Sequence, residues 1–264
     1  MKFPEFDQLV VFENDGIPVI KLDRPEKLNA LNTELFSEVG EAVTWLQSNN
    51  SSRAIILTAE GKGFIAGADL GGYASSGNEE FEIFQSLGQA IYDTLRDSEQ
   101  IVIAAVNGYA LGGGMEMVLA SDVVFASESA KFGLPEIGVA LLPGGGGTAF
   151  LRSQFPIGFV KDLILSGRFM KPEEALQRGI AQYITSSDDL MHKAIEYAQK
   201  INSRSPDAVL KIKRLLDPRT SQTLSFLAEE RKALLDLFAG ANAREGISAF
   251  LEKRDPEFEV NTNA

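Results

Sequence analysis

The sequence predicts an α/β protein, and three of its features lead to this fold class. Ala54–Thr58 and Ile101–Val106 are short β-branched apolar runs with the composition of buried strands. Each run enters a glycine-rich turn that precedes a helical pattern. From residue 203 onward the pattern is helical only. Strand, turn and helix units that recur in this way are typical of an α/β architecture.

The N-terminal segments are predicted to form a β-hairpin and then a long helix. Gln8–Phe12 and Ile17–Leu22 flank an Asp-Gly pair, which favours a tight hairpin turn. The following helix has one apolar face, and Asn32 or Thr33 can serve as its N-cap. The residues of that face are Leu35, Phe36, Val39, Ala42, Val43 and Leu46.

Further rounds of strand, turn and helix follow. Tyr73–Asn78, after the first glycine turn, is expected to be a flexible loop. Beyond the Ile101–Val106 strand a helix is predicted from Gly114, and then a strand over Asp122–Ala126. Ile180–Ile184 is the last strand candidate. Another amphipathic helix is marked by Phe81, Phe84, Leu87, Ile91 and Leu95.

The length of 264 residues suits one large domain, or one domain with a smaller appendage. We divide the chain into a core over residues 1–202 and a helical region over residues 203–264. A helical tail beyond an α/β core often packs on a partner subunit. We therefore expect residues 203–264 to serve oligomerisation.

Residue counts limit the possible chemistry. The chain has no cysteine, which excludes disulfides, thiolate metal sites and cysteine nucleophiles. Its one histidine, His192, falls in a polar helical run and is expected to be a solvated helix residue, because partners for a triad or a metal site are absent nearby. Acid–base chemistry must then come from Asp, Glu, Lys or Tyr, and no metal site is predicted.

The formal net charge of −12 disfavours nucleic acid as a partner, since nucleic-acid-binding proteins usually show a basic face. An anionic ligand would need lysines placed locally. No apolar run approaches membrane-spanning length, and the N-terminus has no signal-peptide pattern. We expect a cytoplasmic protein without a membrane partner.

The stretch Asn107–Glu116 is a glycine turn between a strand and a helix start. Backbone N–H groups at such a place have no internal partner and can hold a developing negative charge. Glu116 lies just inside the helix, where it could act on a bound molecule or could only make a favourable contact with the helix dipole. The turn over residues 60–70 can present a second N–H group, and two converging donors form an oxyanion hole for an ester or thioester carbonyl. Glu136, which follows Pro135, supplies a second carboxylate, or alternatively is a surface loop acid.

One alternative motif is present. Gly61–Ala66 fits the dinucleotide-binding pattern G-x-G-x-x-A after a strand, but Gly67 and Asp69 interrupt the expected helix start. The sequence contains no Walker loop and no G-x-S-x-G nucleophile elbow.

Three segments, Ile65–Leu70, Asn107–Glu116 and Phe132–Ile137, resemble the enoyl-CoA hydratase (crotonase) family in residue type, order and spacing. The likeness covers nearly the whole chain. It implies an α/β fold built as a spiral of ββα units, with a C-terminal helical region that builds a homotrimer, usually paired into a homohexamer.

The resemblance also implies roles for single residues. The N–H groups of Ala68 and Gly113 would hold the thioester oxygen as an enolate forms. Glu116 would activate water for attack at the β-carbon, and Glu136 would handle the proton at the α-carbon. Gly144 would help to place the water.

The same resemblance implies how an acyl-CoA thioester is bound, with coenzyme A as part of the substrate and no separate cofactor. Ala66 and Leu70 would line the adenine and pantetheine path, and Phe250 would lie near the adenine. Lys27, Lys62 and, from a helix near a subunit boundary, Lys253 would meet the phosphates. Gly71 stands where many members carry a lysine, so one phosphate contact is expected to be missing. Leu28 and Asp69 complete the expected substrate-binding set.

Because the chain keeps both glutamates, the resemblance favours a hydro-lyase of fatty acid β-oxidation. It would add water to a trans-2-enoyl-CoA to give a 3-hydroxyacyl-CoA. Two alternatives remain: an isomerase or other crotonase-type acyl-CoA reaction that uses one glutamate, and a non-catalytic RNA-binding relative, which the acidic charge disfavours. The length and branching of the acyl chain stay open.

Overall fold

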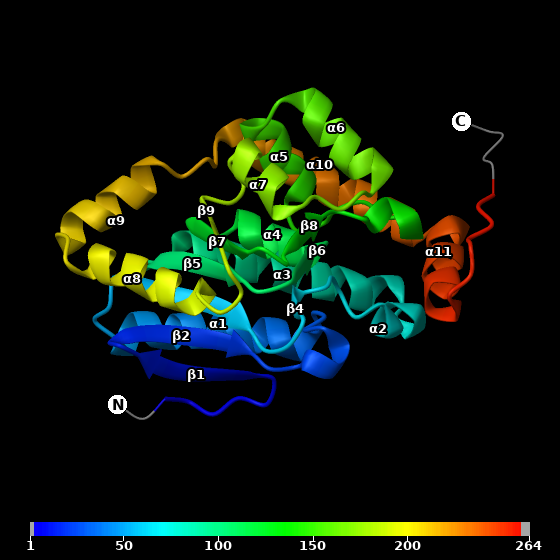
Figure 1. Cartoon of the computed structure of the whole chain (residues 1–264). Coiled ribbons are helices and arrows are strands. Elements are labelled where there is room, and N and C mark those ends of the chain that lie inside the picture. The colour runs from blue at the N-terminus through cyan, green and yellow to red at the C-terminus, as the bar shows by residue number, and fades with distance from the viewer. Residues whose placement is uncertain (1–2, 260–264) are drawn as a thin grey trace.

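The computed structural model describes residues 3–259, and it contains two β-sheets surrounded by helices (Figure 1). In the larger sheet β1 and β2 are antiparallel and all other neighbours are parallel. Its strands, in spatial order, are β1 (Leu9–Asn14), β2 (Ile17–Leu22), β3 (Ala54–Ala59), β5 (Ile101–Val106), β7 (Val123–Ser127) and β9 (Tyr183–Thr185). The smaller, parallel sheet contains β4 (Gly63–Ile65), β6 (Tyr109–Leu111) and β8 (Lys131–Gly133).

The chain passes from the larger to the smaller sheet three times, as β3 to β4, β5 to β6 and β7 to β8. A helical segment follows each pass: α2 (Leu70–Ser75) with α3 (Asn78–Asp97), then α4 (Gly113–Leu119), then the 3₁₀ helix η2 (Glu136–Val139). These repeated units confirm the expected spiral of ββα turns. The strands of the smaller sheet were not predicted, because three residues are too few to show a period.

The central strands β3 and β5 are apolar along almost their whole length, because both faces of the larger sheet are buried there. In β3, Ile55 and Leu57 belong to the core that contains the apolar face of α1 (Thr33–Asn49), whereas Ile56 belongs to the core beneath α8 (Leu190–Asn202). The alternation follows from the two-residue period of a strand. The predicted strands at Ala54 and Ile101 are confirmed.

The predicted hairpin and N-cap are also confirmed. Asp15 and Gly16 both have positive φ angles, 49° and 78°, which a two-residue hairpin turn requires. The side chain of Asn32 caps α1 by accepting a hydrogen bond of 2.8 Å from the N–H of Leu35.

Two predicted elements differ in the structure. The expected loop over Tyr73–Asn78 is wrong, because Tyr73 lies in α2 and α3 begins at Asn78. The ring of Tyr73 packs edge-on against Phe81 and Phe238, with centroids 5.0 and 6.1 Å away, so tertiary packing overrides the small polar residues around it. The last strand begins at Tyr183, because the N–H of Ile180 instead bonds to the end of helix α7 (Pro172–Arg178).

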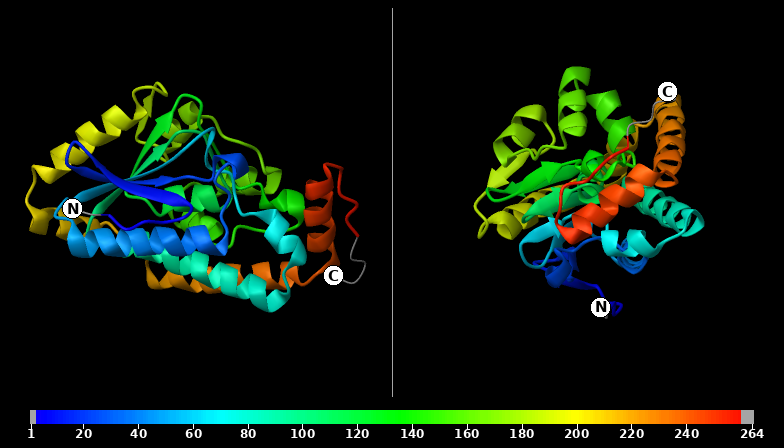
Figure 2. Two further views of the ribbon diagram at one scale, coloured as in Figure 1. Left: turned by 90° about the horizontal axis from the view of Figure 1, so that it is seen from below. Right: turned by 90° about the vertical axis from the view of Figure 1, so that its right-hand side faces the viewer.

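Two of the helices after residue 203 pack on the core. Helix α10 (Ser221–Phe238) packs on α5 (Gly147–Gln154) and α3, and its Leu234 and Phe238 are buried with Phe81. Helix α11 (Ala241–Glu252) packs on η2 and α2, at the end of the molecule opposite α9 (Pro206–Leu215) (Figure 2). The division at residue 203 and a role in oligomerisation stay predictions.

The remaining helices are η1 (Pro25–Lys27) and α6 (Ile157–Ser166). Within residues 3–259, every helix is too short or too polar to cross a membrane.

The start of α4 lies against β4 so closely that only glycine fits there. A Cβ atom on Gly114 would lie 2.1 Å from the carbonyl oxygen of Ile65. This contact is with backbone and cannot be relieved by a side-chain rotation. It brings the two glycine turns predicted from the sequence next to each other.

We expect Gly114→Ala to lower the free energy of unfolding by roughly 1–3 kcal/mol or more, because the added methyl group forces α4 away from β4. Gly158→Ala is the matched control, since a Cβ on Gly158 meets no atom within 4 Å. The control should change stability by less than about 1 kcal/mol. Urea unfolding of both variants tests this expectation, and equal midpoints would contradict it.

Candidate active site

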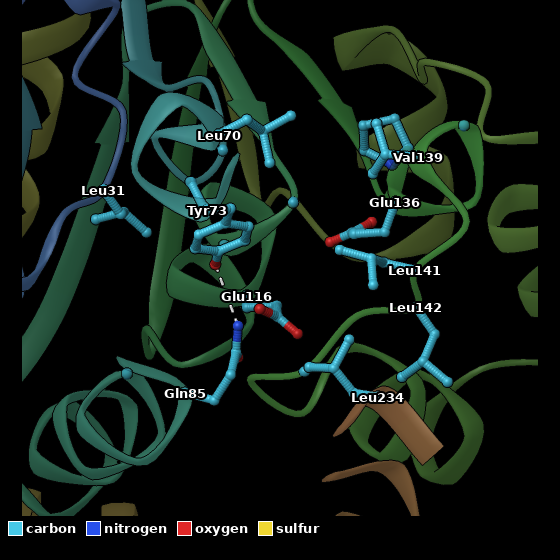
Figure 3. Close-up of a pocket in the computed structure, with 18 of the residues that line it drawn as sticks. Leu31, Leu70, Tyr73, Gln85, Glu116, Glu136, Val139, Leu141, Leu142 and Leu234 are labelled. Atoms are coloured by element: carbon cyan, nitrogen blue, oxygen red, sulfur yellow. Dashed lines mark hydrogen bonds between the residues drawn. The ribbon is translucent and has the colours of Figure 1, made fainter. Parts of the chain in front are cut away.

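A cavity of about 400 Å³ lies between the glycine turns, η2 and helices α2, α3 and α10. Several residues predicted from the sequence line it: Ala66, Ala68, Leu70, Gly113, Glu116, Glu136, Gly144 and Phe250. In Figure 3 the carboxylates of Glu116 and Glu136 point into one space, which Tyr73, Leu141 and Leu234 border. The other lining residues are mostly apolar.

The two glycine turns meet at one side of this cavity. Gly67 and Gly112 have positive φ angles, 113° and 53°, and a Cβ on Gly112 would lie 3.6 Å from the Cα of Gly67. Ala68 and Gly113 follow these glycines directly. Among the described residues, neither of their N–H groups donates a hydrogen bond to a backbone carbonyl.

The N–H of Ala68 donates to no backbone carbonyl of residues 3–259 because of how its segment is attached. The N–H of Leu31 donates to the carbonyl of Gly67, and the N–H of Asp69 donates to the carbonyl of Leu31, both at 2.8 Å. Since neighbouring residues of an extended segment alternate in direction, the N–H of Ala68 points away from Leu31. Two N–H donors at one cavity wall can stabilise an oxygen that becomes negative.

Glu116, in the first turn of α4, is only 5% exposed. Its Oε1 accepts hydrogen bonds from the N–H groups of Gly145 and Gly147, at 2.7 and 2.9 Å. Oε2 has no such partner among the described residues and can meet a water molecule in the cavity. Burial raises the pKa of Glu116, and the two N–H bonds act against that rise by stabilising the charged form.

Glu136 is the first residue of η2. Unlike the carboxylate of Glu116, that of Glu136 has a buried oxygen, Oε2, without a hydrogen-bond partner in the described part of the chain. Burial raises the pKa of Glu136 well above its ordinary value, and the nearby charge of Glu116 raises it further. The pair therefore keeps its proton on Glu136 and its charge on Glu116. The alternative of a surface loop acid is wrong.

Several residues at the site were not predicted, and three of them carry polar groups that bear on its chemistry. The hydroxyl of Tyr73 accepts a hydrogen bond of 3.1 Å from the amide of Gln85, inside the cavity (Figure 3). Burial raises the pKa of Tyr73. The third is Glu230 of α10, which is 6% exposed. It shares the helix face of Leu227 and Leu234, so an acid on an apolar stripe is the signal that could have identified it.

The remaining predicted residues do not line the cavity. Lys27 and Lys62 are both exposed. The turns that carry them are neighbours, since a Cβ atom on Gly61 would lie 2.9 Å from the side chain of Pro25. Lys253 is exposed at the end of α11. Asp69 forms an ion pair with Arg24 at 3.3 Å, Gly71 is in the first turn of α2, and Leu28 follows η1. The expectation for His192 is confirmed: its side chain is 64% exposed on α8.

Comparisons with known proteins cover almost the full chain. Residues 13–261 match the model of the family described as enoyl-CoA hydratase/isomerase. The chain is 36% identical to the short-chain-enoyl-CoA hydratase of Clostridium acetobutylicum, over 94% of this chain and 96% of that protein. It is 35% identical to the 2,3-dehydroadipyl-CoA hydratase of Escherichia coli K12, over 95% and 98%. The crystal structure of carnitinyl-CoA hydratase from Mycobacterium avium superposes with a TM-score of 0.83 at 31% identity, over 96% and 98%.

The raised pKa of Glu136 makes stability depend on pH. A carboxyl group whose pKa is higher in the folded than in the unfolded chain stabilises the fold below its unfolded pKa of about 4.5, and this contribution is lost as pH rises through the folded value. We expect Glu136→Gln to unfold at a higher urea concentration than the wild type at alkaline pH. The difference should shrink toward pH 4.5. Glu128→Gln, on the surface, is the control, and a gap that does not change with pH would contradict the expectation.

Proposed function

We propose that Glu116 and Glu136 together add water to the substrate of this protein. The chain belongs to the enoyl-CoA hydratase/isomerase family and is an enoyl-CoA hydratase. The reaction converts a trans-2-enoyl-CoA into a 3-hydroxyacyl-CoA. The observation that supports this division of work is an unequal pair of acids: Glu116 is buried with two N–H donors, and Glu136 has a buried Oε2 without a partner within residues 3–259. Beside them lie two N–H groups that donate to no backbone carbonyl in that range.

The N–H groups of Ala68 and Gly113 bind the thioester oxygen. They polarise the carbonyl, which makes the β-carbon electrophilic, and they stabilise the enolate that forms when water attacks. One such donor contributes on the order of 3 kcal/mol to transition-state stabilisation. The donors are fixed in the backbone, so they need no rearrangement during the reaction.

Glu116 is the general base. Its Oε2 takes a proton from a water molecule placed beside Gly144, and the hydroxide oxygen forms a bond to the β-carbon. Glu136 is the general acid and gives its proton to the α-carbon as the enolate collapses. The proton on Glu116 and the charge on Glu136 then exchange through solvent, which restores the starting pair.

Binding of the CoA portion uses charges outside the cavity. Lys27 and Lys62 face the phosphates and provide the local positive charge that a −12 protein needs for an anionic substrate. Phe250, which is 62% exposed at the cavity, contacts the adenine. Lys253 reaches the phosphates across a subunit boundary in a homotrimer or a homohexamer. The protein works in the cytoplasm, and coenzyme A enters as part of the substrate.

We expect Glu116→Gln and Glu136→Gln each to lose most of the hydration of crotonyl-CoA, followed as loss of the enoyl-thioester absorbance. The two losses should be distinguishable. Exchange of the α-proton of butyryl-CoA with deuterium oxide needs only the oxyanion hole and the ionised form of Glu136. Glu116→Gln removes a charge that raises the pKa of Glu136 and so favours this form; it should retain the exchange, and Glu136→Gln should not. Near-normal turnover by either variant would remove that residue from the mechanism.

We expect Lys27→Ala and Lys62→Ala to raise KM for crotonyl-CoA with little change in kcat. The contact of an exposed charge pair contributes up to about 1 kcal/mol, which corresponds to roughly a fivefold change in KM. Lys200→Ala, on α8, is the control. If KM in both variants equals that of the control at low ionic strength, these lysines do not bind the phosphates.

A further inference from the structure

Helix α10 brings a third buried carboxylate to the loop that holds Glu116. Oε1 of Glu230 accepts a hydrogen bond of 2.8 Å from the N–H of Gly146, and Oε2 accepts one of 3.0 Å from the N–H of Ala149. Both oxygens are therefore used, and the side chain is 6% exposed. This carboxylate has no part in the reaction described above.

The loop over residues 144–147 is held from two sides. The N–H groups of Gly145 and Gly147 point to Glu116, while those of Gly146 and Ala149 point to Glu230. Consecutive peptide groups thus alternate between the two carboxylates. A change in the position of Gly146 would turn its neighbours and move their N–H groups off Oε1 of Glu116.

Helix α10 fixes the same loop through apolar contacts. A Cβ on Gly144 would lie 2.1 Å from Cδ2 of Leu234, and one on Gly146 would lie 3.1 Å from Cδ2 of Leu227. Glu230 stands between these two leucines on α10. The helix is therefore in contact with the glycine run at Gly144 and Gly146.

We propose that Glu230 is a positioning residue, which holds the glycine loop so that Gly145 and Gly147 present their N–H groups to Glu116. It acts through the loop and touches no substrate. This inference rests on the proposed function of Glu116 as the base, and it makes α10 a part of the catalytic architecture in addition to its packing role.

Glu230 also affects the site through its charge. Burial raises the pKa of Glu230 to about 8, and the charge of Glu116 contributes to this rise. The charge of Glu230 in turn raises the pKa of Glu136. Removing it should therefore lower the pKa of Glu136. Titratable groups on the packed helices include Tyr92 and Arg96 on α3, which interact with the charge of Glu116, and Arg152 on α5, which lies over the ring of Phe226 on α10.

The test compares Glu230→Gln with Glu229→Gln, which changes the exposed neighbour on the same helix. We expect Glu230→Gln to lower kcat for crotonyl-CoA on the order of 100-fold, because small misplacements of a catalytic group have effects of this size. KM should change little, since Glu230 lies away from the CoA path. The alkaline limb of the pH profile, set by the acid Glu136, should move to lower pH. Glu229→Gln should match the wild type in all three.

A second variant separates position from charge. Glu230→Asp keeps the carboxylate but is one methylene shorter, so it cannot reach both Gly146 and Ala149. We expect a lower kcat with an unmoved alkaline limb. A kcat within about twofold of the wild type in Glu230→Asp, or in a folded Glu230→Gln, would overturn the proposal.

One readout does not depend on the reaction. Amide hydrogen exchange at Gly145, Gly146 and Gly147 should be faster in both Glu230 variants than in Glu229→Gln, because the loop loses hydrogen bonds to the side chain at position 230. Unchanged exchange would overturn the positioning role even if the wild type hydrates crotonyl-CoA. If exchange accelerates in the variants and the wild type does not hydrate any enoyl-CoA, the proposed function is wrong, while the conclusion that Glu230 positions the glycine loop remains supported.

Discussion

The stabilisation of one buried carboxylate, Glu116, is the constraint on which the site depends. A charge that is almost fully removed from water is strongly unfavourable unless donors surround it. Here the donors are the backbone N–H groups of Gly145 and Gly147. They can approach only because the loop carries no side chains: a Cβ on Gly145 would lie 2.1 Å from the ring of Tyr92 and 2.6 Å from Oε2 of Glu116. The glycine run is thus required for two reasons: its N–H groups stabilise the charge of Glu116, and a side chain at Gly145 would clash with Tyr92 and Glu116.

The spiral of ββα turns explains how groups distant in sequence meet at one cavity. In the smaller sheet, the strand from each turn of the spiral pairs with the strand from the following turn. The segments after β4, β6 and β8 therefore leave the sheet side by side. The first supplies the N–H of Ala68, the second supplies Gly113 and Glu116, and the third supplies Glu136. The fold therefore brings backbone N–H donors and acids together without long loops, on backbone fixed by strand pairing.

The same arrangement lowers stability. Glu136 has a buried oxygen that finds no partner between residues 3 and 259, and Glu116, Glu136 and Glu230 repel one another when ionised. A large core beneath both faces of the larger sheet offsets this unfavourable energy. The pattern of an unsatisfied acid beside a satisfied one is what acid–base catalysis requires, because it separates two groups of the same ordinary pKa.

The sequence by itself determined the parts of the protein that depend on local chemistry. The hairpin at Asp15, the cap at Asn32 and the buried strands follow from turn geometry, capping and residue periodicity, and the glycine motifs with their glutamates identified the family and the centre of the site. Only the tertiary structure decided the rest. Tyr73 is helical because of rings at Phe81 and Phe238, the strands of the smaller sheet exist because each pairs with another, and Glu230 meets Gly146 across 84 residues. Such features depend on contacts between distant segments, and a local pattern carries no record of a partner that the fold alone brings near.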